Sequence, residues 1–130
     1  SINGKTASSV IDDMDWVENN FLPTVQQRGK AVIDARGASS ATSAAKAALD
    51  TIIACENTTD EGDCFSAAIA SDGAYGVPEG LICGYPLITL EDGNVEIKRD
   101  IVLSDFAMEK FKISIDELSS EREAVKHLLK

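Results

Sequence analysis

The chain has 130 residues and a mass of 13.8 kDa, which is enough for one domain with a hydrophobic core. Twelve basic residues against 22 acidic ones give a formal net charge of -10, which repels the phosphates of nucleic acids and of anionic lipids. The sequence contains no run of about 20 apolar residues and no basic-then-apolar signal peptide. We therefore expect a soluble, cytoplasmic protein that binds neither nucleic acid nor membrane.

The first third of the chain predicts helices. A polar leading segment, residues 1–15, runs into a short helix at about 16–20. From Phe21 onward, apolar or small residues recur at helical spacing, and Pro23 fits the first turn of a long amphipathic helix because that position needs no N–H donor. Gly37 can adopt the left-handed conformation that ends this helix.

A second helix follows directly and ends at about Cys55, before an acidic, turn-rich loop at residues 56–63. Either Ser39 or Ser40 can cap its first amide groups. Small residues crowd its start, and the positive end of its dipole favours a carboxylate, so this junction is a plausible pocket wall. The residues that form its wide apolar face are Ala44, Ala45, Ala48, Leu49, Ile52 and Ile53.

The pattern then changes to that of strands. Apolar residues alternate with small or polar ones at 65–70, and a mostly apolar strand is predicted at 81–90, where Pro86 suggests an edge strand or a bulge. An Asp92-Gly93 turn joins it to alternating residues from Val95, which predicts an antiparallel hairpin. Consecutive strands joined by turns indicate an antiparallel sheet.

Helical signals return at the end of the chain. Ser104 can cap a short helix, and Ser120 with Glu123 forms a capping box that would open a final helix. The residues expected to face inward from that final helix are Ala124, Val125, Leu128 and Leu129. The order of helices, then a small antiparallel sheet, then helices predicts the α+β fold class in one domain spanning residues 1–130.

The cysteines and the acidic loop do not predict a metal site. Cys55, Cys64 and Cys83 are widely spaced and odd in number, so we interpret them as buried or incidental thiols. The acidic residues of the 56–63 loop lack the twelve-residue pattern of a calcium loop, and a solvated loop explains them.

No residue of the chain is predicted to be catalytic. His127 is the only histidine, but it lies near the C-terminus beside Lys126 and is expected to be exposed on a helix. Without a histidine base, Ser40 is a capping residue that can also contact substrate, not a nucleophile. Arg28 and Arg36 can bind a carboxylate in bidentate fashion or form surface ion pairs in this acidic chain.

Along its whole length the chain resembles the C-terminal half of malate dehydrogenases of the cytosolic type. The segments that carry the resemblance are 24–29, Ser39-Ser40-Ala41 with 43–47, 71–78, and Asp105-Phe106 before Glu109-Lys110. The resemblance implies an enzyme that interconverts malate and oxaloacetate with NAD, as a homodimer. Each subunit of such an enzyme has a nucleotide-binding domain in addition to this substrate domain.

The resemblance also implies two site residues. Ser40 matches the family position that lines the substrate pocket, and Thr42 matches the position near the nicotinamide, although a methionine is common there. The family's nucleotide-binding domain, its substrate-clamping arginines and its histidine-aspartate pair match no part of this chain, and His127 does not match the catalytic histidine. The chain by itself is therefore expected to be inactive, with NAD bound mainly by the other domain.

Two alternatives stay open at this point. The chain could be a non-enzymatic interaction domain on the same scaffold, because a fold alone does not fix an activity. It could also be the C-terminal domain of a lactate dehydrogenase, because the residues that separate malate from lactate lie mainly outside this sequence.

Overall fold

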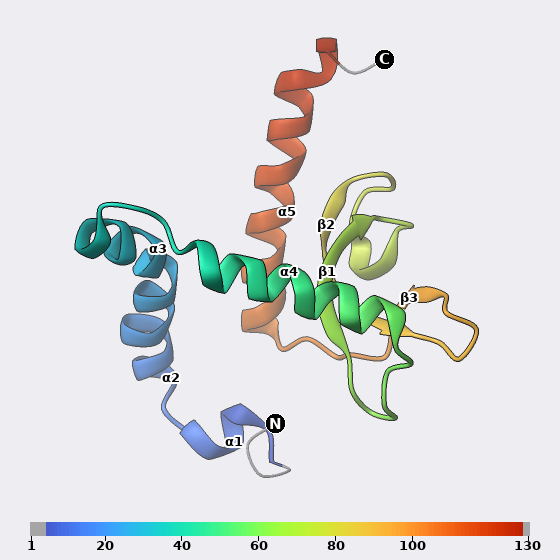
Figure 1. The fold of residues 1–130 in the computed structure, drawn as a ribbon, viewed down its shortest axis with the longest axis horizontal. Coiled ribbons are helices and arrows are strands. Elements are labelled where there is room, and N and C mark those ends of the chain that lie inside the picture. Colours follow the sequence, from blue (N-terminus) through green and yellow to red (C-terminus); the bar gives the residue numbers. More distant parts are fainter. Residues whose placement is uncertain (1–4, 129–130) are drawn as a thin grey trace. The chain divides into compact units, whose positions relative to one another are not determined.

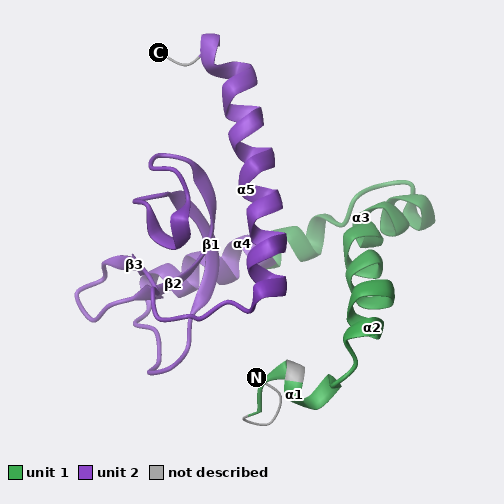
Figure 2. Ribbon diagram, turned by 180° about the vertical axis from the view of Figure 1, so that it is seen from behind, with its two compact units in different colours: residues 1–46 green, residues 47–130 purple. Residues whose placement is uncertain are grey.

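Helices form the N-terminal part of the protein, and a three-stranded sheet with a long helix forms the rest (Figure 1). This computed structural model describes residues 5–128. The chain divides into two compact units, residues 1–46 and 47–130, which are described in turn (Figure 2). The single-domain organisation stays a prediction. No helix within the described range is long and apolar enough to cross a membrane.

The first unit is a succession of helices. The helix α1, Ala7–Ile11, lies within the polar leading segment, and α2, Met14–Trp16, continues through a π-helical turn, Val17–Phe21, into α3, Leu22–Arg36. The short helix expected at 16–20 is therefore continuous with the long one. α3 ends at Gly37, whose φ of 72° is left-handed and whose N–H donates to the Ile33 carbonyl at 2.8 Å, as predicted. The helix α4, Ala41–Glu56, comes next.

The second unit contains the sheet, whose order is β1-β2-β3. Strand β1 is Phe65–Ala70, β2 is Ile82–Thr89 and β3 is Val95–Ile97, and both pairings are antiparallel. Successive side chains of β1 and β2 alternate between more and less exposed positions, as the sequence pattern predicted. The hairpin turn closes with two bonds, from Leu90 N–H to Asn94 and from Gly93 N–H to Leu90, at 2.8 and 2.9 Å. The α+β fold class is confirmed.

The prediction of an edge strand or bulge at Pro86 is wrong. The strand that carries it is the central one, and its register with β1 runs without interruption from Phe65 opposite Leu87 to Ala70 opposite Ile82. Pro86 still accepts a hydrogen bond on the β3 side, from the Lys98 N–H at 2.9 Å just after β3 ends at Ile97, so only the bond that a residue with an N–H would return is missing.

The core lies on one face of this sheet. Tyr85 and Leu87 are the most completely buried large side chains, each with 1% of its surface exposed, and Val77 of the loop between β1 and β2 belongs to the same buried cluster. The other buried apolar residues are Ala74, Leu81, Cys83, Ile97 and Ile115. Cys83 is thus a core residue, Cys55 is half-buried and Cys64 is exposed, and all three thiols are free.

The C-terminal region is one helix instead of the two predicted. α5 spans Asp105–Val125, and the Ser104 side chain caps it as expected by accepting from the Ala107 N–H at 3.2 Å. Ser120 lies inside this helix, where its hydroxyl donates to the Asp116 carbonyl at 2.9 Å, so the capping box does not form. A serine can satisfy its hydroxyl on the preceding turn without ending the helix.

The end of the chain is also more exposed than predicted. Val125 and Leu128 have 43% and 69% of their surface exposed, and Ala124 is exposed as well, so the expected inward face is absent. Leu129 lies outside the described residues. His127 is exposed in a short 3-10 turn, Lys126–Leu128, as predicted.

Candidate functional site

The junction between α3 and α4 carries the predicted site residues. Gly37 ends one helix, and Ser40 immediately precedes Ala41, the first residue of the other. Ser40 is half-buried whereas its neighbours on both sides are exposed. The first turn of α4 contains no acidic side chain, so no carboxylate of that turn neutralises the positive end of the helix. This end of the helix therefore suits an anionic group.

The hydroxyl of Ser40 bonds to another side chain of the same helix. Its Oγ lies 2.5 Å from the Oγ of Ser43, and either atom can donate. The Ser43 Oγ also lies 3.5 Å from the Ser40 carbonyl oxygen. Ser43 occupies the third position of α4, from which a side chain can reach back to the N-cap residue. The sequence signal that could have identified Ser43 is its spacing of three residues from Ser40.

Thr42 presents a single hydroxyl from an exposed position in the first turn of α4. Within residues 5–128 the strands form one antiparallel sheet, so this region supplies no parallel βαβ unit of the kind that binds dinucleotides. The residues present thus fit NAD only as a minor contact. A hydroxyl can approach one end of such a cofactor.

The two arginines of α3 remain available to an anion. In the described part of the chain, neither Arg28 nor Arg36 forms an ion pair, and both are exposed. The surface ion pairs expected for them are therefore not found there. No group of three or more His, Cys, Asp or Glu side chains in the described range is placed to hold a metal ion.

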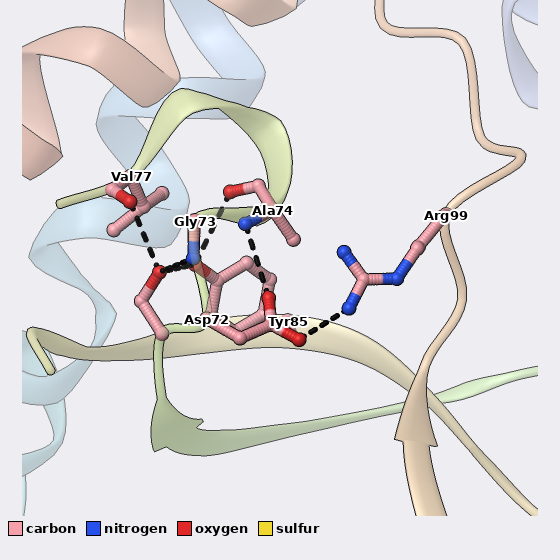
Figure 3. A network of polar contacts seen from close by, with 7 residues as sticks. Asp72, Gly73, Ala74, Val77, Tyr85 and Arg99 are labelled. Atoms are coloured by element: carbon pink, nitrogen blue, oxygen red, sulfur yellow. Dashed lines mark hydrogen bonds and ion pairs between the residues drawn. The ribbon is translucent and has the colours of Figure 1, made fainter. Parts of the chain in front are cut away.

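A polar network that the sequence did not predict holds the loop between β1 and β2 (Figure 3). The Tyr85 hydroxyl donates to the Ser71 Oγ at 2.8 Å, and Ser71 in turn donates to the Val77 carbonyl at 3.1 Å. Burial raises the pKa of Tyr85 above its usual value of 10.0, so the phenol stays a neutral donor. A tyrosine at an inward-facing strand position signals such a need, because its hydroxyl requires a partner when buried.

An ion pair completes the network at its exposed rim. Arg99 bonds to the Asp72 carboxylate, and the Ala74 N–H donates to the same carboxylate at 3.1 Å. The guanidinium and the amide together lower the pKa of Asp72 below its usual 3.8. These contacts fix the loop as a structural element and offer no free catalytic group.

Comparison with known proteins identifies the family of this α+β domain. The lactate/malate dehydrogenase, alpha/beta C-terminal domain family matches residues 3–129. The chain belongs to this family.

Individual relatives are malate and lactate dehydrogenases. The chain is 52% identical over 128 residues to a malate dehydrogenase of Magnetococcus marinus, a match that covers 98% of the chain and 39% of the relative. The crystal structure of malate dehydrogenase from Naegleria fowleri superposes with a TM-score of 0.86 at 37% identity, covering 99% of the chain and 39% of that protein. A lactate dehydrogenase of Trichomonas vaginalis in complex with NADH and oxamate gives a TM-score of 0.78 at 26% identity. The match covers 89% of the chain and 36% of that protein. The chain thus spans about two fifths of the length of these relatives.

Proposed function

We propose that this chain acts as the C-terminal domain of an NAD-dependent malate dehydrogenase, which reversibly oxidises malate to oxaloacetate. The observation that carries the proposal is the 52% identity to a malate dehydrogenase across 98% of the chain. The malate dehydrogenase structure also has a higher identity, 37%, than the lactate dehydrogenase complex, 26%. The comparisons therefore favour malate over lactate.

In this proposal, the hydroxyl of Ser40, at the start of α4, donates a hydrogen bond to a carboxylate of the substrate. The half-buried position of Ser40 supports that role, as does a first helical turn without acidic side chains. Thr42, on the same turn, contacts the nicotinamide end of the cofactor. NAD accepts the hydride when bound, and the small residues of this helix start form a wall that excludes water from the reacting groups.

The remaining groups come from protein outside this sequence. We propose that a nucleotide-binding domain binds most of NAD and supplies the clamping arginines and the proton-accepting histidine. We also propose a cytoplasmic homodimer that uses apolar side chains of α3 and α4. The exposure of those side chains supports the dimer, since Ile52 has 59% of its surface exposed and Val25 has 55%.

The test is an assay of the complete enzyme that carries this domain, with malate and lactate as substrates. We expect malate oxidation with NAD, and Ser40→Ala should raise KM for malate about 10-fold or more because a hydrogen bond to a charged group is lost. Ser114→Ala removes an exposed hydroxyl that bonds to the Lys110 carbonyl in α5 and serves as the matched control. We expect no turnover from the 130-residue chain alone.

Each alternative has its own outcome in this assay. Oxidation of lactate without malate would identify the chain as the lactate dehydrogenase domain. A complete protein that neither binds NAD nor oxidises either acid would support the non-enzymatic interaction domain.

A further inference from the structure

We propose that Ser43 is a positioning residue that orients the Ser40 hydroxyl toward the substrate carboxylate. The inference rests on the proposed function, because it assumes that Ser40 contacts the substrate. The Oγ atoms of the two serines lie 2.5 Å apart. At this distance one hydroxyl must donate to the other.

Two proton arrangements satisfy this contact. In the first, Ser40 donates to Ser43, and the Ser43 proton turns toward the Ser40 carbonyl 3.5 Å away. In the second, Ser43 donates to the Ser40 Oγ, and the proton of Ser40 points away from the pair. Only the second arrangement leaves Ser40 with a donor for a ligand, because a serine hydroxyl has one proton.

A carboxylate selects the second arrangement. An ionised carboxylate only accepts hydrogen bonds, so it can bind Ser40 only when Ser43 has become the donor within the pair. The donor chain then runs from Ser43 through Ser40 to the ligand, and successive hydrogen bonds of this kind strengthen one another. The accepted bond also holds the Ser40 side chain in one rotamer before the substrate arrives. Ser43 therefore acts on the ligand only through Ser40.

The third position of α4 holds a neutral serine instead of an acidic residue. In the common capping box, a Glu or Gln at the third helical position reaches back to the N-cap residue. Here a neutral serine takes that position, which avoids placing a carboxylate beside the expected anion. The absence of acidic residues from the first turn of α4 fits the same requirement.

The experiment is a double-mutant cycle in the complete enzyme, with Ser43→Ala, Ser40→Ala and the double variant. We expect Ser43→Ala to raise KM for malate about 3- to 10-fold, with kcat and KM for NAD little changed. Ser43→Thr keeps the hydroxyl and should stay within about 2-fold of the wild type. Alanine is favourable within a helix, so Ser43→Ala should fold, and Ser114→Ala is again the matched control.

The readout that separates positioning from stability is the coupling of the two serines. If Ser43 acts through Ser40, the double variant has the same KM for malate as Ser40→Ala alone. An equal KM increase from Ser43→Ala in both backgrounds, or none in either, would overturn the inference while leaving malate oxidation by the wild type intact. A wild-type enzyme that does not oxidise malate would overturn the proposed function and this inference together.

Discussion

The phenolic hydroxyl of Tyr75 donates a hydrogen bond to the main-chain carbonyl of Lys98. The register of β2 and β3 places Lys98 opposite Pro86, and the Lys98 N–H donates to the Pro86 carbonyl at 2.9 Å. An antiparallel pair would normally return a second bond to Lys98, but proline has no N–H. Tyr75 thus supplies the donor that Pro86 lacks, which links the loop before β2 to the end of β3.

We predict that Tyr75→Phe lowers the free energy of unfolding by about 1 kcal/mol or slightly more. The substitution keeps the ring, which packs 6.3 Å from that of Tyr85, and removes only the donor to the Lys98 carbonyl. Urea denaturation of the two proteins measures the difference.

The matched control adds Pro86→Ala, which restores an N–H facing the Lys98 carbonyl. In that background we expect Tyr75→Phe to cost less than it does in the wild type, because the new amide can take over the bond. Equal losses in both backgrounds would show that the tyrosine does not substitute for the proline amide.

The elements that could be predicted from sequence are those set by local signals. Gly37 ends α3, the Asp92-Gly93 turn forms the hairpin and Ser104 caps α5, since each depends on residues within a few positions of itself. The role of Pro86 was missed because its compensating donor lies on Tyr75, in a different segment. Sequence patterns do not show such long-range partners.

Asp72 carries a testable electrostatic effect. The Arg99 side chain and then the Ala74 N–H lower its pKa below 3.8, so the ionised form stabilises the folded protein. This stabilisation is fully present at pH values above the pKa that Asp72 has in the unfolded chain. It is lost as the pH falls through the lower pKa that Asp72 has in the folded protein. We predict that Arg99→Gln raises the pKa of Asp72 toward 3.8, as measured by NMR titration of the side-chain carboxyl carbon. An unchanged titration midpoint would mean that Arg99 does not hold this carboxylate in solution.

Thr89 ties the sheet to the end of α4. Its hydroxyl, on a residue only 2% exposed, donates to the Ala54 carbonyl at 2.7 Å. That carbonyl is among the last four of the helix, which have no partner within it. We predict that Thr89→Val, which keeps the shape, lowers the free energy of unfolding by about 1–3 kcal/mol in urea denaturation.

Thr51→Val is the control for Thr89→Val. Thr51 also donates to a carbonyl of α4, that of Ala47 at 2.9 Å, but this carbonyl lies in the helix interior, where it also has a backbone donor. We expect Thr51→Val to change the free energy of unfolding by about 0.5 kcal/mol or less. A loss as large as that of Thr89→Val would show that the helix end is not the source of the effect.

The candidate site shows the same division between local and distant signals. The sequence left either Ser39 or Ser40 at the start of the second helix, and in the structure α4 begins at Ala41, directly after Ser40, because helix boundaries follow from nearby residues. The partner hydroxyl of Ser43 was not predicted, although it lies only three residues away, because serine is not the usual residue at that capping position. The ligand-binding roles of Ser40 and Thr42 stay predictions, since their ligands belong to the proposed complete enzyme.

Two serines, Ser104 directly before α5 and Ser120 inside it, distinguish a helix start from a helix interior. Ser104 accepts from the Ala107 N–H, which otherwise has no partner in the first turn, so we predict that Ser104→Ala lowers the free energy of unfolding by about 1 kcal/mol. Ser120 only donates to a carbonyl of the preceding turn, so Ser120→Ala should be neutral or slightly stabilising because alanine is the better helix former. Thermal unfolding of both variants tests the pair. A larger loss for Ser120→Ala than for Ser104→Ala would instead favour a helix that begins at Ser120 in solution, as the capping-box pattern predicted.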